Sequence, residues 1–133
     1  SKNQKPQNNE KLKKEYCKKQ NTKRISNLEN YNNYEEYIDF RFHLYINRLY
    51  TGIIAEPWIF FIKISDQIDN LSDMKFFRKY KKLRKIEETE KYFLPIYKKC
   101  ENVLSFDKEC IKLYKNFIQM LEDTITKAKL NIN

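Results

Sequence analysis

Few side chains in this sequence have the types and spacing that catalysis needs. His43 is the only histidine, so a multi-histidine metal site is excluded. A Cys–His pair stays open, but His43 lies between Phe42 and Leu44 in a helical pattern, which favours a partly buried structural role. The single glycine, Gly52, cannot form a phosphate-binding or dinucleotide-binding loop, because such loops need several glycines. We therefore expect a protein that is not an enzyme and that uses no metal or cofactor.

The three cysteines offer redox chemistry only if two of them meet. Cys100 and Cys110 are separated by nine residues, and Cys17 lies far from both. If two antiparallel helices meet near Ser105, both sulfurs are equally far from the turn and a disulfide between Cys100 and Cys110 is open. Paired CX9C segments form such hairpins in small mitochondrial proteins, which this chain resembles in one copy of the spacing. We favour the alternative of two reduced, buried thiols, since free cysteine is commonly buried.

The strongest functional signal is residues 75–85, KFFRKYKKLRK, which we call the basic segment. Seven of its eleven residues are Lys or Arg and none is acidic. We predict a helix from Ser72 to about Tyr92 that divides this segment into two faces. The inward face would hold Phe76, Tyr80 and Leu83. The outward face, predicted to bind a partner, would hold Lys75, Arg78, Lys79, Lys82 and Lys85.

A positively charged surface of this kind favours an anionic partner. Candidates are an acidic protein segment, an RNA backbone or an anionic lipid surface. Five lysines against two arginines suit diffuse attraction better than bidentate readout. No RNP1-like, KH or zinc-finger pattern is present. We therefore predict an acidic protein segment and no small-molecule substrate; a solvated face that only keeps the helix soluble is the alternative. The acidic Glu87, Glu88 and Glu90 that follow the segment are interpreted as charge balance on a solvated helix.

The net charge of +9 is concentrated in two places. Residues 1–24 hold nine basic and two acidic side chains, a net charge of +7, and the basic segment contributes another +7. The rest of the chain therefore carries −5. Because residues 1–24 are also poor in hydrophobic side chains, we predict a flexible basic arm there, followed by one folded domain over residues 25–133.

The elements that position the basic segment are predicted to be helices. Hydrophobic residues make up 41% of the 133 residues, but one glycine and three prolines are too few for the turns of a sheet protein. Apolar residues recur every three or four positions. The predicted helices cover residues 34–50 (ended by Gly52), 58–68, 72–92, 95–104 and 107–128 (capped by Asp107). The sequence thus predicts a single all-α bundle of four to five helices with a basic N-terminal arm.

The segment WIFFIKISDQI at residues 58–68 is apolar on almost all sides. Such a helix belongs in the middle of a bundle, so we predict that Trp58 is largely buried. A buried strand is the alternative for so short a run. Glu56, Pro57 and Lys63 interrupt the apolar run, which stays far below the roughly 20 residues of a membrane span.

The sequence is rich in Lys, Asn, Ile and Tyr and has runs such as NLENYNNYEEY, and in this composition it resembles proteins of malaria parasites. Over residues 26–130 the chain is similar in general character to the exported helical PHIST class. The shared features are a polar Asn/Lys-rich lead, a helical domain of similar size and a Trp in an early helix (EPWIFF). This resemblance implies a non-enzymatic adaptor, exported to the infected red cell, that binds acidic tails of adhesins or the membrane skeleton. The residues leave open an RNA-contacting structural subunit of a ribonucleoprotein or mitochondrial assembly, with a mitochondrial or cytoplasmic location.

Overall fold

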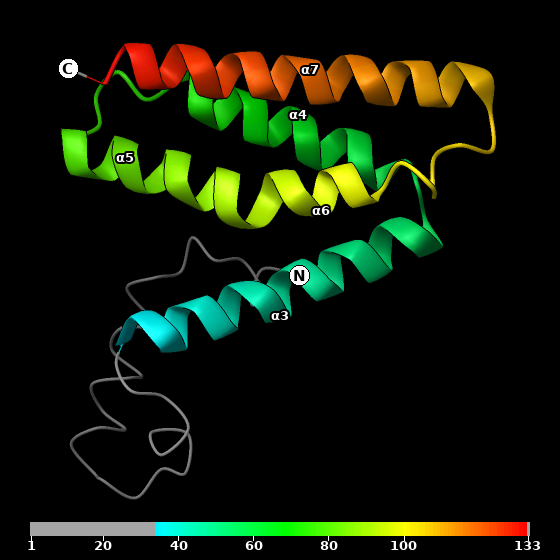
Figure 1. Ribbon diagram of the computed structural model, residues 1–133, viewed down its shortest axis with the longest axis horizontal. Coiled ribbons are helices and arrows are strands. Elements are labelled where there is room, and N and C mark those ends of the chain that lie inside the picture. The colour runs from blue at the N-terminus through cyan, green and yellow to red at the C-terminus, as the bar shows by residue number, and fades with distance from the viewer. Residues whose placement is uncertain (1–33, 133) are drawn as a thin grey trace, which may run out of the picture. The chain divides into compact units, whose positions relative to one another are not determined.

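The computed structural model describes residues 34–132, and these residues are helical with no strand (Figure 1). The elements are α3 (Tyr34–Ala55), α4 (Ile59–Ser72), α5 (Lys79–Glu88), the π-helical η3 (Thr89–Phe93), α6 (Leu94–Lys99) and α7 (Lys108–Leu130). Because α5, η3 and α6 follow one another without a break, they form one helical run. The described residues thus hold four helical rods, and the predicted all-α bundle is confirmed.

The chain divides into two compact units, one that ends at Arg48 and one that begins at Leu49. The predicted arm over residues 1–24 and the predicted domain start at residue 25 lie outside the described residues, as does Cys17. Those boundaries stay predictions. The second unit contains the basic segment and can be described by itself.

Helix α3 is longer than predicted. Gly52 lies within the helix rather than past its end, and the backbone N–H of Glu56 donates to the carbonyl of Gly52 at 2.8 Å. A glycine ends a helix only where it adopts a left-handed conformation, and Gly52 does not. The helix ends at Ala55, shortly before Pro57, whose ring disfavours helical geometry in the preceding residue. His43 is another correction: its side chain is exposed rather than partly buried, with Nε2 3.5 Å from Oδ2 of Asp39.

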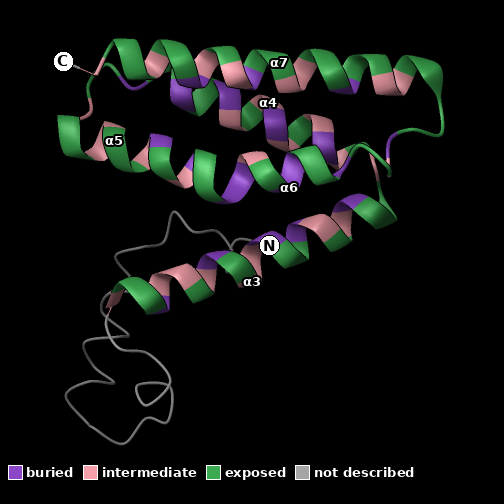
Figure 2. Cartoon of the chain, viewed as in Figure 1, coloured by how far each residue is buried: buried purple, intermediate pink, exposed green. Residues whose placement is uncertain are grey.

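The second unit is a bundle in which α4, the run α5–η3–α6 and α7 pack against one another (Figure 1). Phe60, in the first turn of α4, has no exposed surface. Its ring centroid is 5.6 Å from that of Tyr97 in α6 and 5.1 Å from that of Tyr114 in α7. All three rods therefore meet at one aromatic cluster, and buried and exposed positions alternate along each of them (Figure 2).

Helix α4 is buried on one face only. The buried residues, at helical spacing, are Phe60, Ile64, Ile68 and Leu71. Trp58 is 56% exposed and Ile62 is 55% exposed, so the prediction that Trp58 is buried was wrong. Trp58 precedes the first residue of α4, and the two neighbouring rods cover the side of Phe60 instead. An apolar sequence on all sides does not specify which side its neighbours will cover.

A π-helical turn joins α5 to α6 where we predicted a new helix at Pro95. The backbone N–H of Leu94 donates to the carbonyl of Thr89, five residues earlier. Proline has no N–H to donate and its ring crowds the preceding turn, and a π turn is one way in which a helix continues past such a site. Thr89 is fully buried here: its Oγ1 donates to the carbonyl of Lys85 and accepts from Nε2 of Gln67 in α4, both at 2.9 Å.

Helix α7 agrees with the sequence prediction. The side chain of Asp107 caps it, since Oδ2 accepts from the backbone N–H of Cys110 at 3.1 Å. Tyr114, Leu121 and Ile125 of the predicted stripe are buried. The hydroxyl of Tyr114 donates to the backbone carbonyls of Tyr97 and Lys98, at 3.0 and 2.9 Å, and so ties α7 to the end of α6. Helix α6 ends at Lys99, earlier than the predicted Leu104.

Candidate binding surface

The basic segment begins in a link rather than in a helix. We predicted that Ser72 starts a helix, but it ends α4: its Oγ donates to the carbonyl of Ile68 at 2.8 Å. The chain then turns through residues 73–78, where Met74 is buried and holds the link on the bundle. Arg78 is extended, and α5 begins at Lys79. The first four residues of the basic segment therefore lie in the link.

The three apolar residues predicted to face inward are exposed: Phe76 lies in the link, and Tyr80 and Leu83 lie on the exposed side of α5. Phe76 is 88% exposed, Tyr80 is 65% exposed and Leu83 is 48% exposed, so the prediction that these three face inward was wrong. The inner face of α5 instead carries Ile86, which is followed by the buried Thr89 of η3. This downstream stripe fixes the rotation of α5 about its axis, since Thr89 is bonded to Gln67 of α4 and α5 packs against α7.

The residues predicted to bind a partner divide into two groups. Lys75, Arg78 and Lys79 are exposed, whereas Lys82 and Lys85 are half-buried. Positions 79, 80, 83 and 84 share one side of α5, since they are one, four and five residues apart. This exposed side of α5 therefore presents Lys79, Tyr80, Leu83 and Arg84 together. Positive charge and apolar surface are mixed there rather than segregated.

Within residues 34–132, no ion pair compensates the positive charge of the basic segment. Among the described residues, none of its seven basic side chains lies within ion-pair distance of a carboxylate, although Lys81 lies 4.1 Å from the ring centroid of Phe77. Other lysines of the bundle do pair: Lys98 Nζ is 2.8 Å from Glu122 Oε2, and Lys129 Nζ is 2.6 Å from Glu90 Oε2. The predicted role of Glu90 in balancing the basic segment is thus corrected, because its partner belongs to α7.

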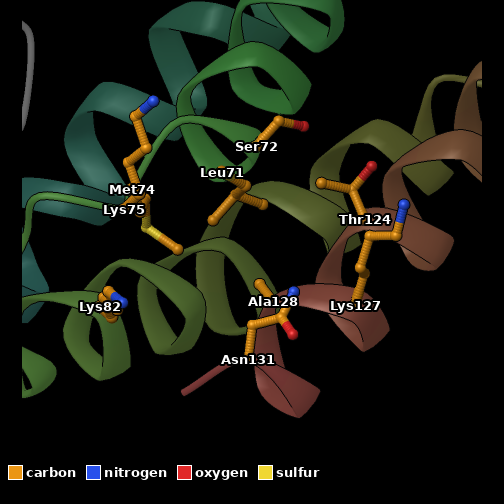
Figure 3. A pocket seen from close by; sticks show the side chains of 9 residues that line it. All are labelled: Leu71, Ser72, Met74, Lys75, Lys82, Thr124, Lys127, Ala128 and Asn131. Atoms are coloured by element: carbon orange, nitrogen blue, oxygen red, sulfur yellow. The ribbon is translucent and has the colours of Figure 1, made fainter. Parts of the chain in front are cut away.

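A pocket of about 510 Å³ opens where the end of α4, the link, α5 and the last turns of α7 meet (Figure 3). Its apolar lining comes from Leu71, Met74 and Ala128. Leu71 and Met74 are almost fully buried, and Ala128 is half-buried. Figure 3 shows the thioether of Met74 and the side chain of Leu71 on one side of this space and Ala128 on another. We call it the lysine pocket, for the residues of the next paragraph.

Three lysines from three different elements line the lysine pocket. Lys75 belongs to the link, Lys82 to α5 and Lys127 to α7 (Figure 3). Lys127 is the residue that the sequence analysis missed, because it lies 45 positions from Lys82. The only sequence signal for a pocket here was Ala128, a small residue in a stripe of otherwise large apolar side chains. A small residue on the inner face of a helix can leave a space between that helix and its neighbours.

The cysteines do not form an activated site in the described residues. Cys100 and Cys110 are both free thiols in the structure, and Cys110 is only half-buried where the sequence analysis favoured two buried thiols. Cys100 is fully buried, donates through Sγ to the carbonyl of Ile96 at 3.3 Å, and has its pKa raised by burial to about 12. Burial, and secondly the charge of Asp107, also raise the pKa of Cys110. A thiol with a raised pKa is protonated at neutral pH and is a poor nucleophile.

Two further structural findings limit the kinds of site. Within residues 34–132, no three His, Cys, Asp or Glu side chains are grouped in a way that could hold a metal ion. Among the described helices, none has both the length and the apolar composition that crossing a membrane requires.

Comparison with protein-family models, with curated proteins and with solved structures gives no match for this chain. The basic segment and the lysine pocket are therefore interpreted from their own chemistry.

Proposed function

We propose that this protein is a non-enzymatic binding module whose basic segment binds an acidic segment of a partner protein. The observation that carries the proposal is the uncompensated charge: seven basic side chains, none paired with a carboxylate of the described residues, share a surface with exposed Phe76, Tyr80 and Leu83. Large exposed apolar side chains grouped within a charged surface are typical of an interaction site, whereas a surface that is charged only for solubility does not need them.

The start of α5 adds a second reason to expect a negative partner. Its first turn contains no acidic residue, and its first four residues include Lys79, Lys81 and Lys82. Positive side chains at this end of a helix are unfavourable, since the helix dipole is positive there. A negatively charged partner segment would relieve both the repulsion among the lysines and the unfavourable interaction with the dipole.

An acidic protein segment fits the surface better than a nucleic acid does. Exposed charge pairs in water each contribute little, so a partner held by charge alone would bind weakly. The exposed Leu83 and the apolar lining of the lysine pocket offer burial to apolar side chains, which a peptide has and a phosphate backbone lacks. The resemblance to exported PHIST proteins supports the same class of adaptor, and the proposal includes export to the host cell.

The exposed aromatic rings favour one alternative, contact with single-stranded RNA. Phe76 and Tyr80 stand among basic side chains, and such rings can stack on unpaired bases. A structural subunit of a ribonucleoprotein would use the same surface. The two functions differ in the partner that binds at physiological salt, so one set of variants tests both.

The test exchanges the exposed charges that lie outside the lysine pocket. In the surface variant, Arg78, Lys79 and Arg84 become Glu; in the control, Lys108, Lys112 and Lys115 of α7 become Glu. All six residues are exposed, and the two variants change the net charge equally. With a labelled Glu/Asp-rich peptide in fluorescence anisotropy, we expect the surface variant to bind about thirtyfold more weakly and the control about twofold.

Salt provides an independent check on the same peptide. Wild-type binding should weaken between 0.1 M and 1 M salt, because the Debye length falls from about 10 Å to about 3 Å. If the surface variant and the control reduce peptide binding equally, the basic segment serves only to keep the protein soluble. Tight binding of single-stranded RNA with no binding of the acidic peptide would establish the alternative function instead.

A further inference from the structure

We infer that the lysine pocket receives one large apolar side chain of the acidic partner, while the surrounding lysines hold the acidic residues on either side of it. This inference rests on the proposed function and deepens it, since it names the pattern that the partner carries. The pattern is a leucine-sized or phenylalanine-sized side chain flanked by Asp or Glu. It also adds residues of α4 and α7 to a surface that so far consisted of the basic segment alone.

The size of the lysine pocket fits a side chain. Ligand pockets range from roughly 300 to 1,000 Å³, and a cavity of about 150 Å³ is enough to hold benzene. At about 510 Å³, the lysine pocket has room for one large side chain together with the adjoining backbone. The thioether of Met74 is unbranched and can adapt to side chains of different shape. Volume alone would therefore admit Leu, Ile, Met or Phe.

The lining of the lysine pocket favours a ligand of mixed chemistry. Leu71 and Met74 are 4% and 5% exposed, so they form only the floor of the pocket, and the half-buried Ala128 adds to its apolar part. Inorganic phosphate or another small anion would pair with the lysines but would leave this apolar part uncovered. A purely apolar ligand would displace water from around three ammonium groups without pairing them, whereas a ligand with an apolar centre and negative charges around it matches both parts of the lining.

The lysines are placed to hold charges on more than one side of the bound side chain. Lys75, Lys82 and Lys127 come from the link, α5 and α7, and none pairs with a carboxylate of the described residues (Figure 3). Their long flexible side chains can follow carboxylates before and after the apolar residue. The side-chain amide of Asn131, at the end of α7, lies on the edge of the same pocket and offers a donor and an acceptor to the backbone of the peptide.

Two peptides of equal charge separate this inference from the proposed function. One is Glu-Asp-Glu-Leu-Glu-Asp-Glu, and the other has Ala in place of the central Leu. We expect the wild-type protein to bind the Leu peptide about tenfold more tightly, since a partly buried leucine contributes about one power of ten. Equal affinities for both peptides would overturn the inference and leave the proposed function standing. Absence of binding to either peptide would mean that the proposed function itself has failed.

The two methionines supply a direct reporter of where the peptide binds. Met74 lines the lysine pocket, whereas Met120 is 48% exposed on α7 and does not line it. With ¹³C-methyl methionine in the full chain, the Leu peptide should shift the Met74 methyl signal and leave Met120 in place, and the Ala peptide should shift Met74 less. A Met74 shift with inorganic phosphate as large as with the Leu peptide would assign the pocket to a free anion. A larger shift with phosphatidylserine vesicles would assign it to a lipid; either result overturns the inference.

Two variants complete the test. Ala128→Phe fills the lysine pocket and should reduce binding of the Leu peptide to the level of the Ala peptide, while binding of the Ala peptide stays unchanged. Lys127 is exposed and lies outside the basic segment, so the Lys127→Gln variant should fold normally. It should bind both peptides about threefold more weakly, whereas Lys115→Gln on the same helix should leave both affinities unchanged. Undiminished binding of the Leu peptide by a folded Ala128→Phe variant, or equal effects of the two lysine variants, would contradict the assignment.

Discussion

Replacement of Thr89 by valine should destabilise the bundle more than its small size suggests. The Thr89 side chain is fully buried at the first position of the π-helical turn. Its hydroxyl donates to the carbonyl of Lys85 and accepts from Nε2 of Gln67, each at 2.9 Å. Because Gln67 belongs to α4, this hydroxyl joins two rods of the bundle and contributes to the rotation of α5. The packing that exposes Tyr80 and Leu83 therefore depends partly on Thr89.

The expected magnitude follows from the two hydrogen bonds. Each contributes about 0.5–1.5 kcal/mol net, and a donor left without a partner in a buried site adds to the cost. Valine has nearly the same shape, so no cavity forms and the added methyl recovers part of the loss. We therefore expect Thr89→Val to lower the free energy of unfolding by about 2 kcal/mol.

Urea unfolding followed by far-UV circular dichroism measures this loss, and the chain offers a matched control. Thr126 on α7 also donates to the carbonyl four residues earlier, that of Glu122, at 3.1 Å, but it is exposed. Thr126→Val makes the same chemical change without burial and without a bond to another helix. It should alter the free energy of unfolding by less than about 0.5 kcal/mol, with an unchanged dependence on urea concentration.

A double-mutant cycle with Gln67→Met locates the effect in the bond between the helices. If the Gln67–Thr89 hydrogen bond is the cause, the two substitutions should be coupled by about 1 kcal/mol rather than additive. The reasoning is refuted if Thr89→Val costs no more than Thr126→Val. It is also refuted if the substitutions at Gln67 and Thr89 add without coupling.

Two further predictions concern burial. Phe60→Ala should lower the free energy of urea unfolding by about 3–5 kcal/mol, because Phe60 has no exposed surface. Trp58→Ala should lower it by less than about 1 kcal/mol, since Trp58 is 56% exposed. A blue-shifted tryptophan emission that acrylamide does not quench would contradict the exposure of Trp58. Stability should fall as the pH rises above about 9 toward 12, because burial raises the pKa of Cys100 from its usual 9.0 to about 12 and only the unfolded chain releases this proton in that range. The Cys100→Ala variant should lose that part of the pH dependence, and an identical slope in both proteins would show that Cys100 does not cause it.

Local signals predicted the parts of this protein that depend on neighbouring residues in the sequence. The side chain of Asp107 caps α7, and the apolar stripe of that helix includes the buried Tyr114 and Leu121, as expected. A capping carboxylate needs a partner only three residues away, and a stripe of spacing three and four needs only one helix. The all-α class follows in the same way from many such stripes and from the lack of turn residues.

The candidate surface was predicted in part. The sequence shows that residues 75–85 carry seven basic side chains, and the structure pairs none of them with a carboxylate of the described residues. Which of these residues face outward was predicted wrongly for Phe76, Tyr80 and Leu83. Within eleven residues, basic and apolar side chains recur at compatible spacings, so the segment itself allows more than one rotation about the helix axis.

The sequence by itself determined the helical class, the position and cap of the last helix and the location of the positive charge. Only the tertiary structure decided which side of α5 faces outward, that Trp58 is exposed, and that Lys127 joins Lys75 and Lys82 at one pocket. The physical reason is the range of the interactions. Capping and periodicity act within one helix, whereas the rotation of α5 depends on Thr89 and Ile86 packing toward another helix. The pocket depends on three elements that meet only after the bundle has formed.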